Sequence, residues 1–478
     1  MSAASIPNLT PTTPLSPDLA VVRKSKGPVL TLLEELYKIG PGPSSSHTMG
    51  PMRITWDFHE RVSKLPAEQL ARATALKVHL FGSLSATGRG HGTDRAALAG
   101  LLGHAPATCS PEFLDSLDRD PGRVYTLKLG AAELLLTRAD VIFDDTKGPF
   151  PHPNTMKVRL LAGEETLYEL EYYSVGGGFI EWKGYVAPEK GAPAYPYSSW
   201  NELNGHLTET GLPLSRILLE NEQSIGGRSE QAVRKFLDQV ANVMVETVNN
   251  GLKAEGVLPG PIGLQSKAAA ILRRGRESHF PADRAISTIA AYALAGAEEN
   301  ARGHVIVTAP TAGSAGVLPA IVKALRENRK VSKKSLREGL LAAAAIGYLC
   351  KHNATLSGAA GGCQAEIGVA SAMAAALGTQ ASGYSPRVVA NAAESALEHH
   401  LGITCDPVAG YVQVPCIERC AFGAIKAWTA SAIACDESTT RHRVDLDTCI
   451  AAMAMTAHDM SSRYKETSEA GLAALVLC

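Results

Sequence analysis

Hydrophobic positions follow two different patterns along the chain. In the first part, residues 157–174 alternate between apolar and polar side chains, and such alternation predicts a β-strand. Further strand-like runs occupy residues 72–82, 124–129 and 134–143. Helical spacing occurs at residues 32–36 and 98–102. The first 185 residues are therefore predicted to mix strands and helices.

Beyond residue 187 the pattern changes to Ala-rich stretches with helical spacing. Residues 187–200 are rich in Pro, Gly, Ser and Tyr, which is typical of a domain boundary. Helices are predicted for residues 214–255, 285–302, 335–350, 363–378, 388–399, 418–433 and 445–461. The predicted fold class is α+β, a small mixed α/β N-terminal domain followed by a mostly helical domain. The predicted divisions are a disordered tail (1–27), an α/β domain (28–186), a linker (187–213) and a helical domain (214–478).

Composition and charge exclude several classes of protein. The 478 residues include 46 Lys+Arg and 47 Asp+Glu, a formal charge of −1, whereas a nucleic-acid-binding protein carries a basic excess. No apolar run reaches the about 18 residues that span a bilayer, so no membrane partner is expected. Residues 1–27 are rich in Ser, Thr and Pro. They contain one arginine, so a cytoplasmic location is predicted, with a mitochondrial transit peptide as the alternative.

Cysteines are concentrated in the second part of the chain. Eight of the nine lie in the last 130 residues. Cys363 ends the glycine-rich run SGAAGGC at residues 357–363, and Cys405 and Cys416 lie on either side of a predicted loop. Three thiolates on loops and helix starts suit a soft metal or an iron–sulfur cluster. Burial in the core and a zinc site that includes Cys420 are the alternatives.

Several longer motifs resemble the iron–sulfur-dependent L-serine dehydratases of the single-chain type. The cysteine motif continues as QAE to residue 366 and is followed by Cys405 and Cys416. The other motifs are IGPGPSSSHTMGP (39–51), GSL (82–84), GRGHGTD (88–94), HPNTM (152–156), SVGGGF (174–179) and YKETS (464–468). The resemblance extends from about residue 30 to the end of the chain.

This resemblance implies a cofactor, a reaction and an assembly. A 4Fe–4S cluster would be held by Cys363, Cys405 and Cys416, with the C-terminal Cys478 able to reach the open iron in the resting state. The enzyme would convert L-serine to pyruvate and ammonia in amino-acid catabolism, which supplies gluconeogenesis, and it would be a homodimer. The open iron would act as a Lewis acid on the substrate hydroxyl.

The same reaction needs a base for the Cα proton and groups that bind the substrate. The candidate bases are His91, His47 and His152, because an imidazole titrates near neutral pH. We favour His91, whose glycine neighbours allow a small ligand to approach closely, with His47 holding substrate or sharing the proton. The candidate substrate-binding residues are Ser44, Ser45, Ser46, Thr48 and Asn154. A helix N-cap is the alternative role for the hydroxyl groups, and a turn is the alternative for Asn154.

Two other functions remain open at this point. A pyridoxal-phosphate dehydratase would make the same products, but neither Ser266-Lys267 nor Ser332-Lys333 has the context of a Schiff-base lysine. A cluster-based redox sensor or a zinc-stabilised scaffold would not need the Ser- and His-containing loops of the first part. Lys465 and Glu466 are expected either to orient the tail at the site or to form a surface ion pair.

Overall fold

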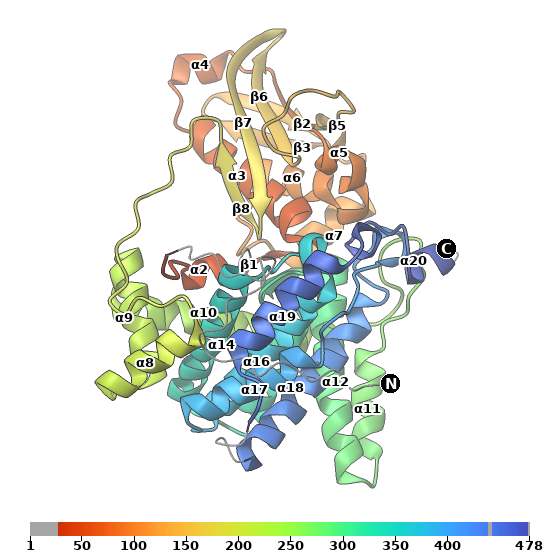
Figure 1. Ribbon diagram of the computed structural model, residues 1–478. Coiled ribbons are helices and arrows are strands. Elements are labelled where there is room, and N and C mark those ends of the chain that lie inside the picture. The colour runs from red at the N-terminus through yellow and green to blue at the C-terminus, as the bar shows by residue number, and fades with distance from the viewer. Residues whose placement is uncertain (1–26, 438–441, 477–478) are drawn as a thin grey trace, which may run out of the picture.

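The computed structural model describes residues 27–437 and 442–476 (Figure 1). The predicted tail lies outside this range except for Gly27, and so does Cys478. The chain forms a sheet-containing N-terminal region above a mostly helical C-terminal region, which confirms the predicted α+β class. Among the described residues, no helix has the length and apolar character of a membrane span.

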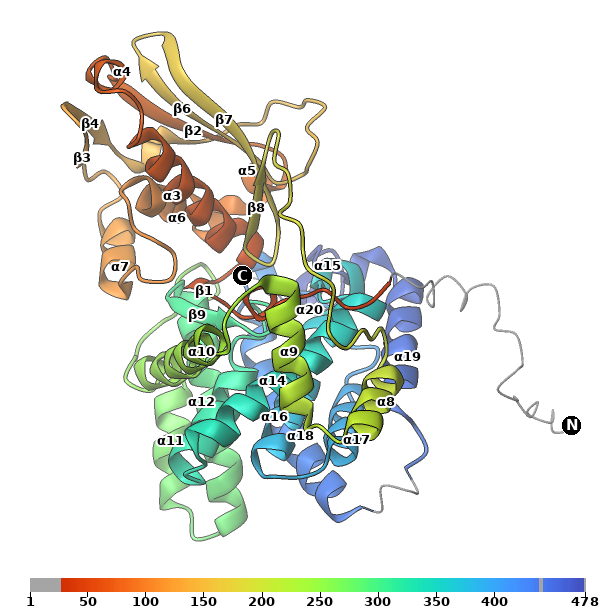
Figure 2. The same cartoon turned by 90° about the vertical axis from the view of Figure 1, so that its left-hand side faces the viewer.

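A five-stranded sheet forms the centre of the N-terminal region. Its strand order is β5 (Val141–Phe143), β2 (Ala75–Leu80), β6 (Thr155–Ala162), β7 (Glu165–Gly176) and β8 (Phe179–Trp182). All neighbours are antiparallel except β2 and β5. Helices α3 (Gly50–Val62) and α6 (Thr93–Leu101) pack together, and α3 contacts β6, β7 and β8 (Figure 2). Alternation along β2 buries Leu76, Val78 and Leu80.

Two of the predicted strands are interrupted in the structure. Residues 157–174 form the hairpin β6–β7, which turns at Gly163 with φ +60°. The run 134–143 is divided between β4 (Ala132–Leu136), the turn η3 (Arg138–Asp140) and β5, because the Asp140 carboxylate accepts from the backbone N–H of Thr137. The region also contains β3 (Tyr125–Leu129), α4 (Ala67–Ala71), α5 (Ser83–Thr87), η2 (Gly88–His91) and α7 (Pro111–Arg119).

Helices packed around α16 (Val369–Ala381) form the C-terminal region. Every residue of α16 except Gln380 is buried. The helix contacts α14 (Lys333–Asn353), α17 (Pro386–Glu398) and α18 (Cys416–Asp436). The Ala-rich surface of α16 lets α14 approach closely. A Cβ added to Gly339 of α14 would lie 2.8 Å from the carbonyl oxygen of Leu377 in α16. The principal helices are α9 (Leu214–Gly226), α10 (Glu230–Gly251), α12 (Pro281–Arg302), α14 (Lys333–Asn353), α17 (Pro386–Glu398), α18 (Cys416–Asp436) and α19 (Leu446–Asp459).

The elements of the C-terminal region differ from the predicted pattern in three ways. The single helix expected at 214–255 is α9 followed by α10, because Gly227 has φ +67° and Ser229 caps a new helix. The predicted linker contains α8 (Trp200–Thr210), whose buried Leu203 belongs to the C-terminal core. The pattern also missed α11 (Ala268–Glu277), α13 (Val317–Lys323), β9 (Val305–Thr308) and the short helix α20 (Leu472–Leu475).

The chain crosses between the two regions near its beginning. Helix α2 (Leu33–Leu36) buries Leu33 and Leu36 in the C-terminal core, although both fall in the predicted N-terminal domain. Strand β1 (Lys38–Pro41) then pairs antiparallel with β9 of the C-terminal region. This pairing places the motif that follows β1 at the junction of the two regions (Figure 1).

Candidate active site

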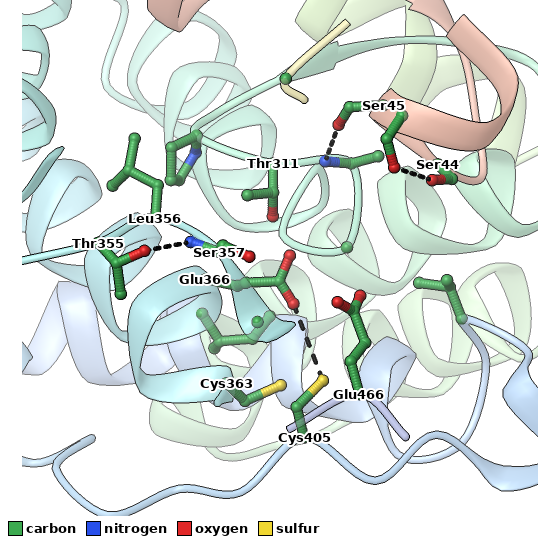
Figure 3. A pocket seen from close by; sticks show the side chains of 18 of the residues that line it. Ser44, Ser45, Thr311, Thr355, Leu356, Ser357, Cys363, Glu366, Cys405 and Glu466 are labelled. Atoms are coloured by element: carbon green, nitrogen blue, oxygen red, sulfur yellow. Dashed lines mark hydrogen bonds between the residues drawn. The ribbon is translucent and has the colours of Figure 1, made fainter. Parts of the chain in front are cut away.

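A cavity of about 460 Å³ lies between the two regions and brings their motifs together. The N-terminal region contributes Ser44, Ser45, Ser46 and His91 to its lining. The C-terminal region contributes the thiol groups of Cys363, Cys405 and Cys416. Figure 3 shows two of these serines on one side of the cavity and two of the cysteines on the other. Most of the predicted site residues therefore share one cavity.

Two thiols and a carboxylate form a tight group in this cavity. The Sγ atoms of Cys363 and Cys405 and a carboxylate oxygen of Glu366 all lie within 4.8 Å of one another. Cys363 directly precedes the π-helical turn η5 (Gln364–Gly368), and Cys405 follows α17. Cys416, the first residue of α18, lines the same cavity but does not belong to the tight group.

The charges around the thiols affect their protonation. The hydrogen bond between the two thiols lowers the pKa of Cys363 and raises the pKa of Cys405. Burial raises the pKa of Cys416 well above its usual value, and the neighbouring Cys363 acts in the same direction. The Arg419 guanidinium lies beside Cys363 and favours its thiolate. Because thiolates are the metal-binding form, the Arg419 guanidinium favours metal binding by Cys363.

The space beside the thiols suits a bulky inorganic group. A Cβ on Gly358 would lie 2.7 Å from Glu366 Oε2 and 3.4 Å from Cys405 Sγ, so any side chain there would fill the space beside these ligands. A donor set of three cysteines on one cavity wall matches the preference of soft metals and iron–sulfur clusters. These residues therefore fit a cluster of the predicted type.

Three glutamates line the cavity, and two of them lie at the thiols. No role was predicted for Glu366, and Glu466 was expected either to orient the tail at the site or to form a surface ion pair. Glu366 and Glu466 lie side by side, next to the thiols (Figure 3). Burial raises the pKa of Glu366 well above its usual value, and Glu466 adds to this effect. Glu466 has φ +64°, a conformation that is uncommon for a residue with a side chain. The tail motif that contains Glu466 was recognised, but its contact with the cysteines depends on a distant segment.

Backbone pairing holds the tail motif against the cysteine loop. The N–H of Cys405 donates to Tyr464 O at 2.8 Å, and the N–H of Glu466 donates to Cys405 O at 2.7 Å. These bonds form a short parallel bridge between Cys405 and Lys465. Glu466 therefore lines the cavity, and it forms no ion pair with any other residue that the structure describes.

His91 lies in the cavity with its ring held in one tautomer. Its Nδ1 is 3.0 Å from Thr87 O, and a carbonyl oxygen can only accept, so Nδ1 carries the proton. The other ring nitrogen, Nε2, therefore has a free lone pair. Burial lowers the pKa of His91, so the ring is neutral near pH 7.

His47 lies behind the cavity wall, between two serine hydroxyls. Its Nδ1 is 2.8 Å from Ser46 Oγ and its Nε2 is 2.9 Å from Ser83 Oγ. Burial, together with the neighbouring His91 ring 5.0 Å away, lowers the pKa of His47 to about 4. A neutral ring has one donor and one acceptor nitrogen, so Ser83, His47 and Ser46 form a continuous hydrogen-bonded chain. This chain ends at the cavity with Ser46.

The other predicted residues have different positions. Thr48 is buried, and its hydroxyl donates to His91 O at 2.8 Å, so it supports the backbone of the histidine. His152 and Asn154 do not line the cavity. His152 Nδ1 accepts from the Asn154 N–H at 3.0 Å, and the Asn154 amide donates to Ser174 O, which agrees with the turn interpretation. Cys478 lies outside the described residues.

Neither lysine that was considered for a Schiff base reaches the cavity. Lys267 forms an ion pair with Glu418, and Lys333 begins helix α14. Neither residue lines the cavity that contains the cysteines. Cys420, the additional zinc candidate, is fully buried, and its thiol contacts Gly313 O. It does not line the cavity either, which agrees with a packing role.

Comparisons with known proteins match both parts of the chain. The serine dehydratase beta chain family matches residues 33–185, and the serine dehydratase alpha chain family matches residues 209–473. L-serine dehydratase 2 of Escherichia coli (strain K12) is 41% identical over 452 residues, which cover 92% of this chain and 97% of that protein. The L-serine dehydratase of Streptomyces coelicolor is 40% identical over 459 residues, 93% of this chain and 98% of that protein. Haemophilus influenzae has an L-serine dehydratase that is 39% identical over 456 residues.

These matches cover both regions that line the cavity, in the order in which the regions follow one another in the sequence. We conclude that the chain belongs to the serine dehydratase family and carries the beta-chain and alpha-chain parts in a single polypeptide.

Proposed function

We propose that the protein is an L-serine dehydratase that depends on a 4Fe–4S cluster. The reaction removes the Cα proton and the β-hydroxyl of L-serine, which together leave as water. The product of this step is aminoacrylate. The imine tautomer of aminoacrylate then hydrolyses to pyruvate and ammonia. The observation that carries this proposal is the shared cavity, in which three cysteines of one region face serine and histidine side chains of the other.

Cys363, Cys405 and Cys416 would hold the cluster. Three protein ligands leave one iron site open, and when bound the cluster supplies a Lewis acid for the substrate hydroxyl. Gly358 keeps space beside Cys405 for a group of this size. Arg419 offsets the negative charge of the thiolates, since its guanidinium group lies beside Cys363 and Cys416. It also pairs with Asp406 at 3.3 Å, which helps to hold it in place. Cys478 stays a predicted resting-state ligand.

His91 is the proposed base for the Cα proton. The bond from its Nδ1 to Thr87 O leaves Nε2 able to accept a proton. Its lowered pKa keeps Nε2 unprotonated at neutral pH. Thr48 fixes the backbone carbonyl of His91 and so holds the ring at the cavity wall.

The serine motif is the proposed site for the substrate carboxylate. Ser44 caps the turn η1 (Ser45–Met49), and its Oγ accepts from the His47 N–H at 3.1 Å. Ser45 Oγ accepts a weak bond of 3.4 Å from the Ala312 N–H of the C-terminal region. Ser46 Oγ lines the cavity while it contacts His47, so His47 and Ser83 orient this hydroxyl toward a bound anion.

Neither Lys267 nor Lys333 lines the cavity, so the two lysines considered for a Schiff base give no support to pyridoxal-phosphate chemistry. A sensor would not need a substrate cavity lined by His91 and three serines. We also propose a homodimeric, cytoplasmic enzyme of amino-acid catabolism, with gluconeogenesis as one use of its pyruvate. The homodimer and the use in gluconeogenesis rest on the resemblance, and the cytoplasmic location rests on the composition of the N-terminal tail.

The test is anaerobic purification with iron and sulfide counting, followed by a pyruvate assay on L-serine. Cys363→Ser is expected to lose both iron and pyruvate formation. The matched control is Cys435→Ser, which changes a partly exposed cysteine outside the cavity on the same helix as Cys416. This control is expected to keep both properties. Full turnover of L-serine by an iron-free preparation would refute the proposed chemistry.

A further inference from the structure

A second cavity, of about 480 Å³, lies beside the active-site cavity. Pro43, His91 and Val412 line both cavities and form a wall between them. The second cavity is built by α6, α7 and η2 of the N-terminal region together with the end of α12 and the loop 411–413 of the C-terminal region. Apart from His91, none of the residues in the proposed reaction lines it.

Its lining carries an excess of positive charge. The carboxylates that line it are Asp115 and Asp118. The basic side chains that line it are Arg89, Arg95, Arg119, Arg138, Arg302 and His304. Burial opposes charge on His304, but hydrogen bonds to Asp115 and Glu299 raise its pKa to about 9, so the ring is cationic at neutral pH.

The nearby carboxylates do not neutralise this set. Asp118 accepts from both Arg95 and Arg138, and Arg138 also pairs with Asp94 at 2.7 Å. Within the described residues, Arg89 and Arg119 form no ion pair. Their side chains are exposed at the rim of the cavity, where a mobile anion can reach them.

Two of the lining guanidinium groups have a buried nitrogen without a hydrogen-bond acceptor. These are Nε of Arg95, whose side chain is 5% exposed, and Nη1 of Arg302, whose side chain is 11% exposed. The carboxylate oxygen nearest to Arg302 Nη1, on Glu299, is 3.6 Å away, beyond normal hydrogen-bond length. Buried N–H groups are nearly always paired, so these arginines point to an acceptor that the chain itself does not provide.

We propose that this second cavity binds a small oxyanion, through arginines contributed by both regions. Carboxylate and phosphate share the required chemistry, because both offer several oxygens to guanidinium donors. An anion that contacts Arg119 of α7 and Arg302 of α12 joins the two regions on the side of the His91 wall away from the cysteines. Occupancy therefore stabilises the arrangement on which the active-site cavity depends.

The experiment is isothermal titration calorimetry on the full-length protein purified anaerobically. Sodium phosphate and sodium pyruvate are titrated at constant ionic strength, with sodium chloride as the reference for non-specific binding. The variants are Arg119→Gln at the exposed rim of the second cavity and Arg302→Gln in the buried part of its lining. The matched control is Arg123→Gln, an exposed arginine of the same region that does not line the cavity. Thermal melting without added anion checks that each variant folds.

Saturable binding of one anion per chain is expected, and the tighter titrant identifies whether phosphate or carboxylate is the natural class. Arg119→Gln should weaken this binding about 10-fold, as for the loss of one charge-assisted hydrogen bond, and Arg123→Gln should leave it unchanged. The proposal is wrong if neither anion binds saturably, which would leave water as the occupant. It is also wrong if folded Arg119→Gln and Arg302→Gln bind as tightly as the wild type. Pyruvate can also bind at the carboxylate site proposed for the active-site cavity, so only binding that Arg119→Gln and Arg302→Gln weaken is assigned to the second cavity. Phosphate binding that these variants weaken supports the second cavity even if the protein does not turn over L-serine.

Discussion

A buried histidine at the junction of the two regions should make stability depend on pH in the alkaline range. His304 Nδ1 is 2.8 Å from Glu299 Oε2, and Nε2 is 3.1 Å from Asp115 Oδ1 of the N-terminal region. The His304 side chain is 12% exposed and the Glu299 side chain 3%. Burial disfavours the charged ring, but the two carboxylates prevail and raise the pKa of His304 from 6.5 to about 9.

The direction and size of the effect follow from this shift. A group with a raised pKa in the folded state contributes its full stability below pH 6.5, and that contribution is lost as the pH rises through 9. The difference between 6.5 and about 9 corresponds to about 3 kcal/mol of unfolding free energy, at 1.36 kcal/mol per pKa unit. Burial raises the pKa of Asp115, but the hydrogen bond from His304 and nearby positive charges lower it below its usual value. This hydrogen bond is one of the two that raise the pKa of His304, so its contribution is counted only once.

The perturbation is His304→Gln, which removes the titrating charge. Urea unfolding followed by circular dichroism, at several pH values from 6 to about 10 and without phosphate or carboxylate buffers, measures the free energy of unfolding. Cysteines and lysines also titrate in this range, so the observable is the difference between wild type and variant. That difference should shrink by about 3 kcal/mol as the pH rises. His458→Gln, whose side chain is 87% exposed, is the matched control. Parallel pH curves for wild type and His304→Gln would refute the reasoning.

Three predictions concern the active site. His91→Asn should lower kcat at least about 100-fold with unchanged iron content, as expected for a base, and near-normal kcat would remove His91 from that role. Ser83→Ala removes the hydroxyl that lies 2.9 Å from His47 Nε2, so kcat should fall about 10-fold. Ser83→Thr keeps a hydroxyl and should recover the rate, whereas an unchanged kcat in Ser83→Ala would show that the chain of hydroxyl groups is not used. Gly358→Ala places a Cβ 3.4 Å from Cys405 Sγ and should reduce the iron and sulfide content, whereas Gly205→Ala, which meets no atom within 4 Å, should not; full iron loading of Gly358→Ala would contradict the fit.

Local patterns were sufficient for the fold class and for much of the site. Alternation predicted β2 and the hairpin strands, and helical periodicity predicted α12, α14, α17, α18 and α19, because each pattern reflects which face of an element is buried. The motifs identified the serines, His91 and the three cysteines, all of which line one cavity. The hydrophobic pattern did not predict where a helix ends, as at Gly227, which separates α9 from α10. Such an end depends on the backbone conformation of a single residue, which the pattern does not contain.

Contacts between distant segments could not be predicted in the same way. The position of Glu466 beside the thiols depends on backbone bonds from the tail to Cys405, and a short segment can pair with any exposed backbone edge. The sequence also singled out His152 as a candidate base, but its ring is engaged with the Asn154 backbone and does not line the cavity. Residue type alone does not tell which histidine faces a cavity.

The order of motifs and the spacing of buried side chains are properties of the chain, and they predicted the family, the two-part architecture and the three cysteines that line the cavity. The hydrogen-bond partners of the charged and polar side chains depend on packing. Ser83 contacts His47 within the N-terminal region, and Asp115 of that region contacts His304 of the C-terminal region. Such pairs form between groups far apart in sequence, and their strength depends on how completely water is excluded around them. The pKa values and the unpaired arginines of the second cavity therefore became visible only when the regions were seen packed together.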